Sequence, residues 1–399
     1  MAEQLRIALY AYALATLLLM TGLGYQSAPR GLAVYRSTPG GAHSEVPSAS
    51  ESRETPGLNS AAAGDSEALR PHADRMGFTL GSLLSQGPDW TRDMQLQETV
   101  GREFNTAVSV VYMKFAEPEQ GQFKLGFMDR AKDIARKYNL RLFGQTLVYR
   151  ASDTTPPWLH LDRPDCGGWS ANELDRILRD YIHTVVRYGG DSYSTWEVVN
   201  EPITPSHNGC WSKVLGQEEY IAKAFHYARE ASPNGTLLLN DTFGPSGVDK
   251  SRTDEFFAFV RSLKSRGVPI DAVGSEMHLD AEKLHSNYTD ELKYWLRQAR
   301  EAGVRAQITE IDVYQGSAQA VPNPLENQKQ IYYNVLRTCL QDSNCTGFIT
   351  WGITDKYTWR RNPESKNAHH ADASPCLFDE DFGKKPAYYG VLQALQEGR

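Results

Sequence analysis

Ser194-Thr195-Trp196-Glu197-Val198-Val199-Asn200-Glu201-Pro202 is the segment that decides how the rest of this 399-residue chain is interpreted. Its two adjacent valines are β-branched and apolar, which predicts a buried strand. Pro202 has no backbone N–H to donate, so the strand should end before it. Glu201 therefore follows the carboxyl end of a buried strand, where a carboxylate is a candidate acid or base. We expect Glu197, within the strand, to be structural.

Other apolar runs alternate with segments of helical spacing from Met76 onward. The expected strands cover residues 78–80, 108–113, 140–148, 195–200, 236–240, 272–277, 306–313 and 347–351. The expected helices cover residues 89–103, 126–138, 171–188, 218–230, 251–265, 290–302, 327–340 and 386–395. This order indicates the α/β class and a single (β/α)8 TIM barrel over residues 76–399. An open doubly wound sheet is the alternative, but no GxGxxG motif follows the first strand.

Two segments precede the barrel. Within residues 1–25, an apolar run from Ile7 to Tyr25 follows Arg6 and predicts a signal peptide or a signal anchor. No clean small-x-small cleavage site follows, so both alternatives stay open. Residues 26–75 are rich in Ser, Ala, Gly and Pro, which predicts a disordered linker. We therefore expect a secreted protein, or one anchored in a membrane and facing outward.

Composition and motifs narrow the partners and cofactors. A net charge of -7 without a basic, aromatic-interleaved stripe argues against nucleic-acid binding. No CxxC motif or Cys/His cluster has metal-ligand spacing, so we expect no metal and no cofactor. In an exported chain, Asn-x-Ser/Thr motifs are candidate glycan acceptors, here at Asn234, Asn240, Asn287 and Asn344. Asn240 ends an expected strand and should be too enclosed.

The chain has five cysteines, which suits disulfides in an exported protein. Cys339 and Cys345 lie close enough in sequence for a small disulfide loop. Cys166 and Cys210 each sit beside Gly and Trp and are candidates for a second bridge. Cys376 would then be a buried thiol, although the pairing among these last three cysteines stays open.

In a barrel of this kind the active site lies at the carboxyl ends of the strands. Glu201 and Glu310 end the fourth and seventh strands, which lie across the mouth from each other. Two facing carboxylates suit glycosidic bond cleavage. One is protonated and assists the leaving oxygen, while the other is ionised and either attacks the anomeric carbon or activates water. Asp312 shares a strand face with Glu310, and His278 is placed to bridge the two and keep Glu310 ionised.

Each of these residues also has a simpler explanation when taken alone. A single glutamate at a strand end is more often a salt-bridge partner, and a single histidine or tryptophan is more often part of a core. The pair of glutamates at the ends of strands four and seven favours catalysis. Asn200 is then placed to hold the 2-hydroxyl of the sugar.

Three segments resemble signature segments of glycoside hydrolase family 10, the endo-1,4-β-xylanases. They are Trp196–Pro202, Ile308–Asp312 and Trp351–Trp359. The resemblance runs in order over residues 76–399 and implies retaining chemistry, with Glu201 as acid/base and Glu310 as nucleophile. It implies a polysaccharide or oligosaccharide substrate, by default xylan, and we expect a monomer. It also implies a Cys339–Cys345 disulfide, and sugar contacts from Lys114, Asn200, His278, Trp351 and Trp359.

The chain departs from the family pattern around the sugar-binding pocket. Val110 and Val111 replace a Glu-Asn pair. Gln145, Tyr149 and Arg150 replace two histidines and a tryptophan, and Glu276 replaces a glutamine. We expect these departures to alter specificity, with substrate contacts from Gln145, Tyr149, Arg150 and Glu276. We also expect Arg150 and Glu276 to form an ion pair.

Two alternatives to a xylanase follow from these departures. One is a related glycosidase that removes sugar from a plant glycoside such as a saponin. The other is a carbohydrate-binding barrel without catalysis. The presence of Glu201, Glu310, Asn200, His278 and Asp312 counts against the second alternative.

Overall fold

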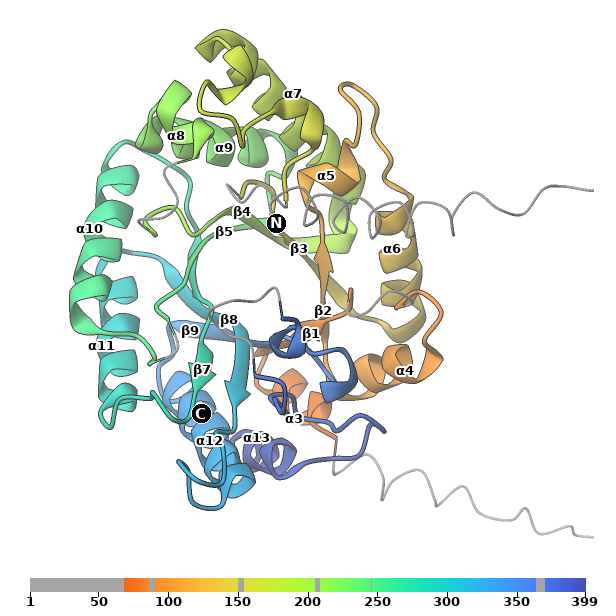
Figure 1. Ribbon diagram of the computed structural model, residues 1–399, viewed down its shortest axis with the longest axis vertical. Helices are drawn as coiled ribbons and strands as arrows, with labels where there is room; N and C mark the ends of the chain where they lie inside the picture. Colours follow the sequence, from red (N-terminus) through yellow and green to blue (C-terminus); the bar gives the residue numbers. More distant parts are fainter. Residues whose placement is uncertain (1–67, 86–89, 150–153, 205–208, 245, 364–369) are drawn as a thin grey trace, which may run out of the picture. The chain divides into compact units, whose positions relative to one another are not determined.

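Parallel strands close into a barrel in the computed structural model, which describes residues 68–85, 90–149, 154–204, 209–244, 246–363 and 370–399 (Figure 1). The strands are β1 (Thr79–Leu83), β2 (Thr106–Val110), β3 (Arg141–Gln145), β4 (Tyr193–Asn200), β5 (Thr236–Asp241), β6 (Ala272–Ser275), β7 (His278–Asp280), β8 (Arg305–Tyr314) and β9 (Cys345–Thr350). Each pairs with the next in this order through β6. Pairings of β6 with β8, β8 with β9 and β9 with β1 then close the ring. The prediction of a TIM barrel is confirmed, and the open sheet is excluded because the ring closes.

The sixth strand of the barrel is interrupted. It was expected to run from residue 272 to 277, but β6 ends at Ser275 and β7 begins at His278. Met277 has a φ of 57°, a left-handed conformation that breaks the extended backbone. β7 pairs with the second half of β8, so that His278 lies opposite Asp312.

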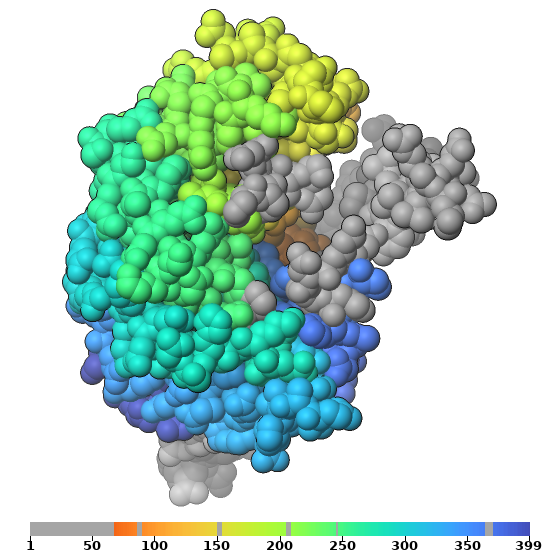
Figure 2. Space-filling model, turned by 60° about the vertical axis from the view of Figure 1, so that its left-hand side comes forward, coloured from red at the N-terminus to blue at the C-terminus, as the bar shows by residue number. Residues whose placement is uncertain are grey.

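Helices surround the barrel strands, as Figure 1 shows. They are α3 (Arg70–Arg75), α4 (Met94–Glu103), α5 (Met113–Ala116), α6 (Gly126–Tyr138), α7 (Ala171–Gly189), α8 (Cys210–Leu215), α9 (Gln217–Ala231), α10 (Lys250–Ser265), α11 (Tyr288–Glu301), α12 (Pro324–Leu340) and α13 (Pro386–Glu397). Figure 2 shows the green and blue segments, which include α10 and α11, as a continuous outer surface. No helix in the described part of the chain is long and apolar enough to cross a membrane.

Two predicted boundaries differ from those in the structure. The linker was expected to extend to residue 75, but α3 occupies its last residues because Leu69 and Ala73 are fully buried there. The second strand was expected to reach Met113, but it ends at Val110 because Met113 begins the short helix α5. The apolar segment 7–25 and most of the predicted linker lie outside the described residues.

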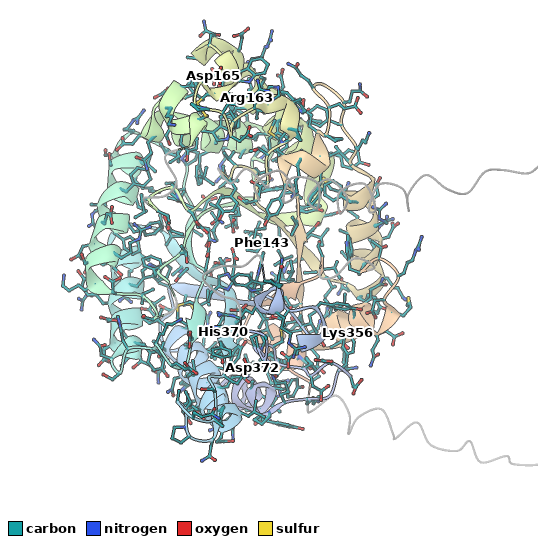
Figure 3. All side chains as sticks on the ribbon, viewed as in Figure 1. Phe143, Arg163, Asp165, Lys356, His370 and Asp372 are labelled. Atoms are coloured by element: carbon teal, nitrogen blue, oxygen red, sulfur yellow. A yellow bond between two sulfur atoms is a disulfide. The ribbon has the colours of Figure 1, made fainter. Side chains whose placement is uncertain are left out.

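Apolar side chains form two cores. The smaller fills the inside of the barrel with Leu83, Val108, Phe143, Leu238, Ala272 and Ile349, and Figure 3 shows Phe143 at the centre of the ring. The larger core lies between the strands and the helices. Trp196 belongs to it, fully buried and stacked on Tyr193 with ring centroids 4.7 Å apart. The alternation of strand residues explains why the neighbouring residue, Glu197, points away from this outer core.

Two disulfides fasten loops around the barrel. Cys339–Cys345 joins the end of α12 to the start of β9, and Cys166–Cys210 joins the loop after β3 to α8. Both predicted pairings are confirmed, and Cys376 is the buried free thiol.

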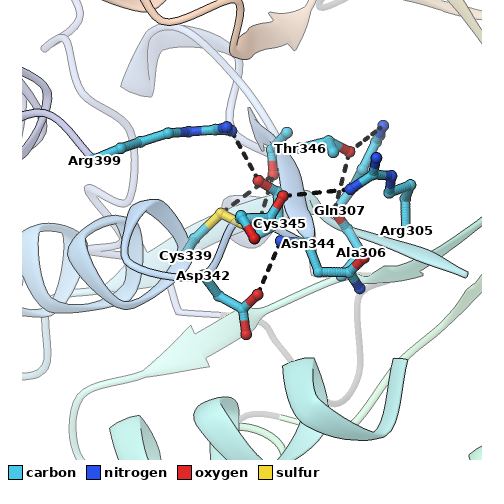
Figure 4. Close-up of a disulfide and its surroundings, with 11 residues drawn as sticks. Arg305, Ala306, Gln307, Cys339, Asp342, Asn344, Cys345, Thr346 and Arg399 are labelled. Carbon is cyan, nitrogen blue, oxygen red and sulfur yellow. Dashed lines mark hydrogen bonds between the residues drawn. A yellow bond between two sulfur atoms is a disulfide. The ribbon is translucent and has the colours of Figure 1, made fainter. Parts of the chain in front are cut away.

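The candidate glycan acceptors differ in exposure. Asn234 and Asn287 are exposed, whereas Asn240 is fully buried, as expected. The expectation for Asn344 is wrong, because this residue lies beside the Cys339–Cys345 disulfide (Figure 4) and is only 8% exposed. Its amide nitrogen donates to the backbone oxygen of Val304 at 2.9 Å, so it has no room for a sugar.

Candidate active site

A cleft of about 460 Å³ opens at the carboxyl ends of the strands and brings together most of the predicted site. The predicted residues that line it are Gln145, Tyr149, Asn200, Glu201, Glu276, His278, Glu310, Trp351 and Trp359. Asp312 lies behind His278, and Lys114 lies in α5 and is not among the lining residues that the structure describes. Arg150, and with it the predicted Arg150–Glu276 ion pair, lies outside the described residues.

Glu310 is held by hydrogen bonds at both of its carboxylate oxygens. The side-chain amides of Gln145 and Asn240 donate to Oε1, the latter at 3.1 Å. His278 Nε2 lies 3.2 Å from Oε2. Glu310 is 4% exposed and sits midway along β8, so the barrel wall fixes its backbone. The carboxylate is therefore held in one orientation at the floor of the cleft.

His278 connects Glu310 to a second, deeper carboxylate. Its Nδ1 lies 3.0 Å from Asp312 Oδ1, which confirms the predicted bridge between the two acids. Burial lowers the pKa of His278, but the charges of Asp312 and Glu310 outweigh burial and raise that pKa to about 9. The imidazole is consequently protonated at neutral pH and places a positive charge beside Glu310.

Asp312 is anchored from behind. Arg360 donates to its Oδ1 through Nε and Nη2, at 3.0 and 2.7 Å, and the indole of Trp359 donates to its Oδ2 at 2.6 Å. Burial raises the pKa of Asp312, but the charges of Arg360 and His278 outweigh it and hold that pKa at about 2. Asp312 thus stays ionised and fixes the orientation of His278.

Glu201 lies just beyond the end of β4, where the opening segment predicted it. Its φ of 49° turns the chain out of the strand directly before Pro202, and its N–H donates to the backbone oxygen of Asn240 at 2.9 Å. The hydroxyl of Tyr149 donates to Glu201 Oε1 at 2.8 Å. Burial and the charge of Glu201 raise the pKa of Tyr149, so this phenol remains a hydrogen-bond donor.

Asn200 and Asn240 form a bridge between the two glutamates. Asn240 Nδ2 donates to Asn200 Oδ1 at 3.0 Å as well as to Glu310. Asn240 Oδ1 accepts from the hydroxyl of Thr309 at 2.7 Å, and this bond distinguishes the oxygen of the Asn240 amide from its nitrogen. Because Asn200 Oδ1 is already occupied, its amide donor is the group left to face a substrate.

Two further glutamates, Glu197 and Glu276, lie close to Glu310. Burial and the charge of Glu310 raise the pKa of Glu276, and the same two causes raise that of Glu197. Both carboxylate oxygens of Glu197, and Oε1 of Glu276, lack a hydrogen-bond partner among the described residues. Both groups therefore favour the neutral acid. Glu197 was expected to be purely structural, but its carboxyl group also interacts electrostatically with Glu310.

Sequence reasoning missed several residues of the site. Besides the predicted set, the cleft is lined by Tyr112, Thr146, Thr242, Gly244, Asp280 and Arg360. Arg360 directly follows Trp359 and could have been found as a cation near a buried acid. Asp280 ends β7 and the others follow β2, β3 and β5, so their place at strand ends was the available signal.

The geometry is that of a double-carboxylate hydrolytic site. One carboxylate, Glu310, is immobilised beside a cation and lines the cleft, as a nucleophile requires. The other, Glu201, lies at the rim next to a neutral donor. Trp351 and Trp359 flank His278, with ring centroids 6.2 and 5.0 Å from the imidazole, and provide apolar faces for a sugar ring.

Comparison with known proteins identifies the family. The model of "Glycosyl hydrolase family 10" matches residues 68–394. The chain belongs to glycoside hydrolase family 10. The chain is therefore a glycoside hydrolase, and the resemblance to family 10 that the three signature segments indicated is confirmed.

Relatives of this family 10 chain carry xylanase names. It is 31% identical to an endo-1,4-beta-xylanase of Agaricus bisporus over 74% of this chain and 84% of the relative. It is 28% identical to endo-1,4-beta-xylanase B of Thermotoga neapolitana over 81% of this chain and 88% of the relative. Among solved structures, xylanase 10B of Thermotoga petrophila RKU-1 in complex with xylobiose matches with a TM-score of 0.71 and 28% identity, covering 83% of this chain and 97% of that chain.

Proposed function

We propose that this family 10 chain is a retaining endo-1,4-β-xylanase, with Glu310 as the nucleophile and Glu201 as the general acid and base. The names of its relatives support xylan as the substrate class. The complex of a related barrel with xylobiose supports xylose units as occupants of the cleft.

The fixed carboxylate of Glu310 is the observation that carries the proposal. Its Oε1 accepts two amide donors and its Oε2 faces the imidazole that Asp312 holds. A carboxylate so oriented loses little freedom on attacking the anomeric carbon, which lowers the entropic part of the barrier. The protonated imidazole of His278 lies beside this carboxylate and orients it for the attack.

The reaction then proceeds in two displacements. In the first, a Glu310 oxygen bonds to the anomeric carbon, the glycosidic C–O bond breaks, and Glu201 gives its proton to the departing oxygen. In the second, Glu201 as a carboxylate takes a proton from water, whose oxygen attacks the same carbon and displaces Glu310. Each step inverts the carbon, so the two together retain its configuration.

Asn200 and the tryptophans position the sugar in this scheme. The free amide donor of Asn200 is placed for the 2-hydroxyl of the sugar bound to Glu310, a contact that strengthens in the transition state. A site that only binds carbohydrate has no need for a carboxylate fixed by three donors, which disfavours the non-catalytic alternative. No observation favours a saponin over xylan.

A substrate panel with matched variants tests the proposal. The full chain would be incubated with xylan, xylooligosaccharides, cellooligosaccharides and a steroidal glycoside, with products identified by mass and the first-formed anomer by NMR. We expect shortened xylooligosaccharides of β configuration. Glu201→Gln should lower turnover of xylan by about 10²–10⁴-fold, and Glu310→Gln should lower it further.

Glu98→Gln serves as the control, because Glu98 is exposed on α4, remote from the cleft lining. It should leave turnover unchanged. First-formed products of α configuration would contradict retention. Full activity of Glu310→Gln would contradict the nucleophile assignment, and cleavage of the steroidal glycoside alone would contradict xylan.

A further inference from the structure

Glu276, His278 and Glu310 converge on one point of the cleft. Their ligand-capable atoms all lie within 4.8 Å of one another. His278 Nε2 is 3.2 Å from Glu310 Oε2 and 3.8 Å from Glu276 Oε2. Around a tetrahedral zinc ion with bonds of 2.0–2.1 Å, ligand atoms stand about 3.3 Å apart. The two separations that involve His278 lie close to that spacing.

We propose that this triad is a regulatory site for a first-row divalent cation of the Zn²⁺ class, which binds Glu276, His278 and Glu310 and reversibly inhibits the proposed xylanase. The inference rests on the proposed function only for its inhibitory effect. The site itself stands on the three side chains.

An unpartnered, buried carboxylate points to a missing ligand. Glu276 is 3% exposed and lines the cleft, yet its Oε1 has no hydrogen-bond partner among the described residues. A buried acid without a partner is costly.

The charges around the triad favour a cation. Among the described side chains, Asp312 is balanced by Arg360 at 2.7 Å, whereas the cation beside Glu276 and Glu310 is the imidazole of His278. A divalent ion that displaces the proton of Glu276 and the Nε2 proton of His278 would balance both carboxylates, so binding should release protons. An imidazole together with carboxylates selects zinc and its first-row neighbours over Mg²⁺ and Ca²⁺, which prefer oxygen ligands alone.

The surrounding bonds also orient the ligands. Asp312 accepts from Nδ1 of His278, so an ion would displace the Nε2 proton and bind that nitrogen, in the carboxylate–histidine–metal arrangement of many zinc sites. Gln145 and Asn240 both occupy Oε1 of Glu310, which leaves Oε2 for the ion. An ion on Oε2 would tie up the nucleophile and stand where the sugar binds, so inhibition would compete with substrate.

Titration calorimetry with ZnCl₂ tests the site directly. The full chain without an affinity tag would be compared with Glu276→Gln, which keeps the size of the side chain and removes its charge. We expect one Zn²⁺ bound per wild-type chain at the cleft, at least about tenfold weaker binding to Glu276→Gln, and no comparable binding of Mg²⁺. Glu291→Gln is the matched control, since Glu291 pairs with His285 at 3.3 Å on the exposed surface, and it should bind Zn²⁺ as the wild type does.

Inhibition kinetics on an aryl β-xyloside give the second readout. In the wild type, Zn²⁺ should raise KM and leave kcat unchanged. In Glu276→Gln, the rise in KM should be smaller. Equal Zn²⁺ affinity of the wild type and Glu276→Gln, or equal affinity for Mg²⁺, would overturn the proposal. Binding is measured without substrate, so the two hypotheses fail separately. Glu276-dependent binding by a chain that does not cleave xylan contradicts only the proposed function, and xylan cleavage without such binding contradicts only the metal site.

Discussion

Tyr149 gives the rim carboxylate of this active site a neutral hydrogen-bond donor. Its hydroxyl lies 2.8 Å from Glu201 Oε1, and burial keeps the phenol protonated. A donor stabilises the ionised form of a carboxylate more than the neutral acid. The proposed acid must nevertheless be protonated when the leaving group departs, so Tyr149 limits how far toward alkaline pH the enzyme can work.

Tyr149→Phe should therefore widen the activity profile on its alkaline side. A hydrogen bond to a charged group is worth about 1.5–3 kcal/mol, and about 1.4 kcal/mol corresponds to one pH unit. We expect the alkaline limb of the kcat/KM profile to move upward by about one unit, measured on an aryl β-xyloside. Tyr333→Phe, which alters a hydroxyl on the exposed surface of α12, should not move it. An alkaline limb that stays in place or moves downward would show that Tyr149 does not act through Glu201.

The strand elements show why much of the barrel was predictable. Buried runs such as Leu237-Leu238-Leu239 of β5 lie within strands, and β-branched or apolar residues mark them without any knowledge of the fold. The long helices carry a clear apolar face. The short helices α5 and α8 have only four and six residues, too few to show helical periodicity. The interruption of the sixth strand at Met277 depends on a left-handed backbone conformation, which a methionine in the sequence does not predict.

The residues of the candidate active site were predictable only in part. Glu201, Glu310 and His278 were found because a parallel barrel collects its strand ends at one mouth. The bond from Tyr149 to Glu201 could not be found, because it depends on how far a side chain reaches across two strands. Lys114 was expected at a strand end, but the early start of α5 moves it away from the described lining of the cleft.

Packing between β3, β4 and α7 gives a prediction at the level of elements. A Cβ added to Gly144 would lie 2.5 Å from two ring atoms of Trp196 and 3.2 Å from Tyr193, closer than real contacts allow. Trp196 is fully buried and cannot swing into solvent. We expect Gly144→Ala to lower the free energy of unfolding by about 1–3 kcal/mol, measured by urea denaturation.

Gly126→Ala is the matched control for this packing. Gly126 is exposed in the first turn of α6, and an added Cβ would approach only Arg130, at 3.8 Å. Alanine has the higher helix propensity, so this variant should be as stable as the wild type or slightly more stable. Equal stability of the two variants would contradict the proposed fit of Trp196 against β3.

At the scale of the whole molecule, the raised pKa of a buried acid in the cleft makes stability depend on pH. The pKa of Glu276 is raised in the folded chain by burial and by the charges of Glu310 and Glu201. The unfolded chain releases this proton near the ordinary value of 4.5, whereas the folded chain retains it. As pH rises above that value, ionisation stabilises only the unfolded state, by about 1.4 kcal/mol per pH unit, until the folded group ionises too.

Glu276→Gln should consequently stabilise the fold at pH 7 and not at pH 4. Glutamine resembles the neutral acid in size and polarity, so the two chains should be equally stable where the glutamate is protonated in both states. Urea denaturation in the presence of EDTA at the two pH values measures the difference, and Glu98→Gln, on the exposed surface of α4, should show none. A gain of equal size at both pH values would mean that charge is not its cause. Replacing EDTA with Zn²⁺ should narrow the gain at pH 7, because an ion that binds only the folded wild-type chain stabilises that chain by mass action.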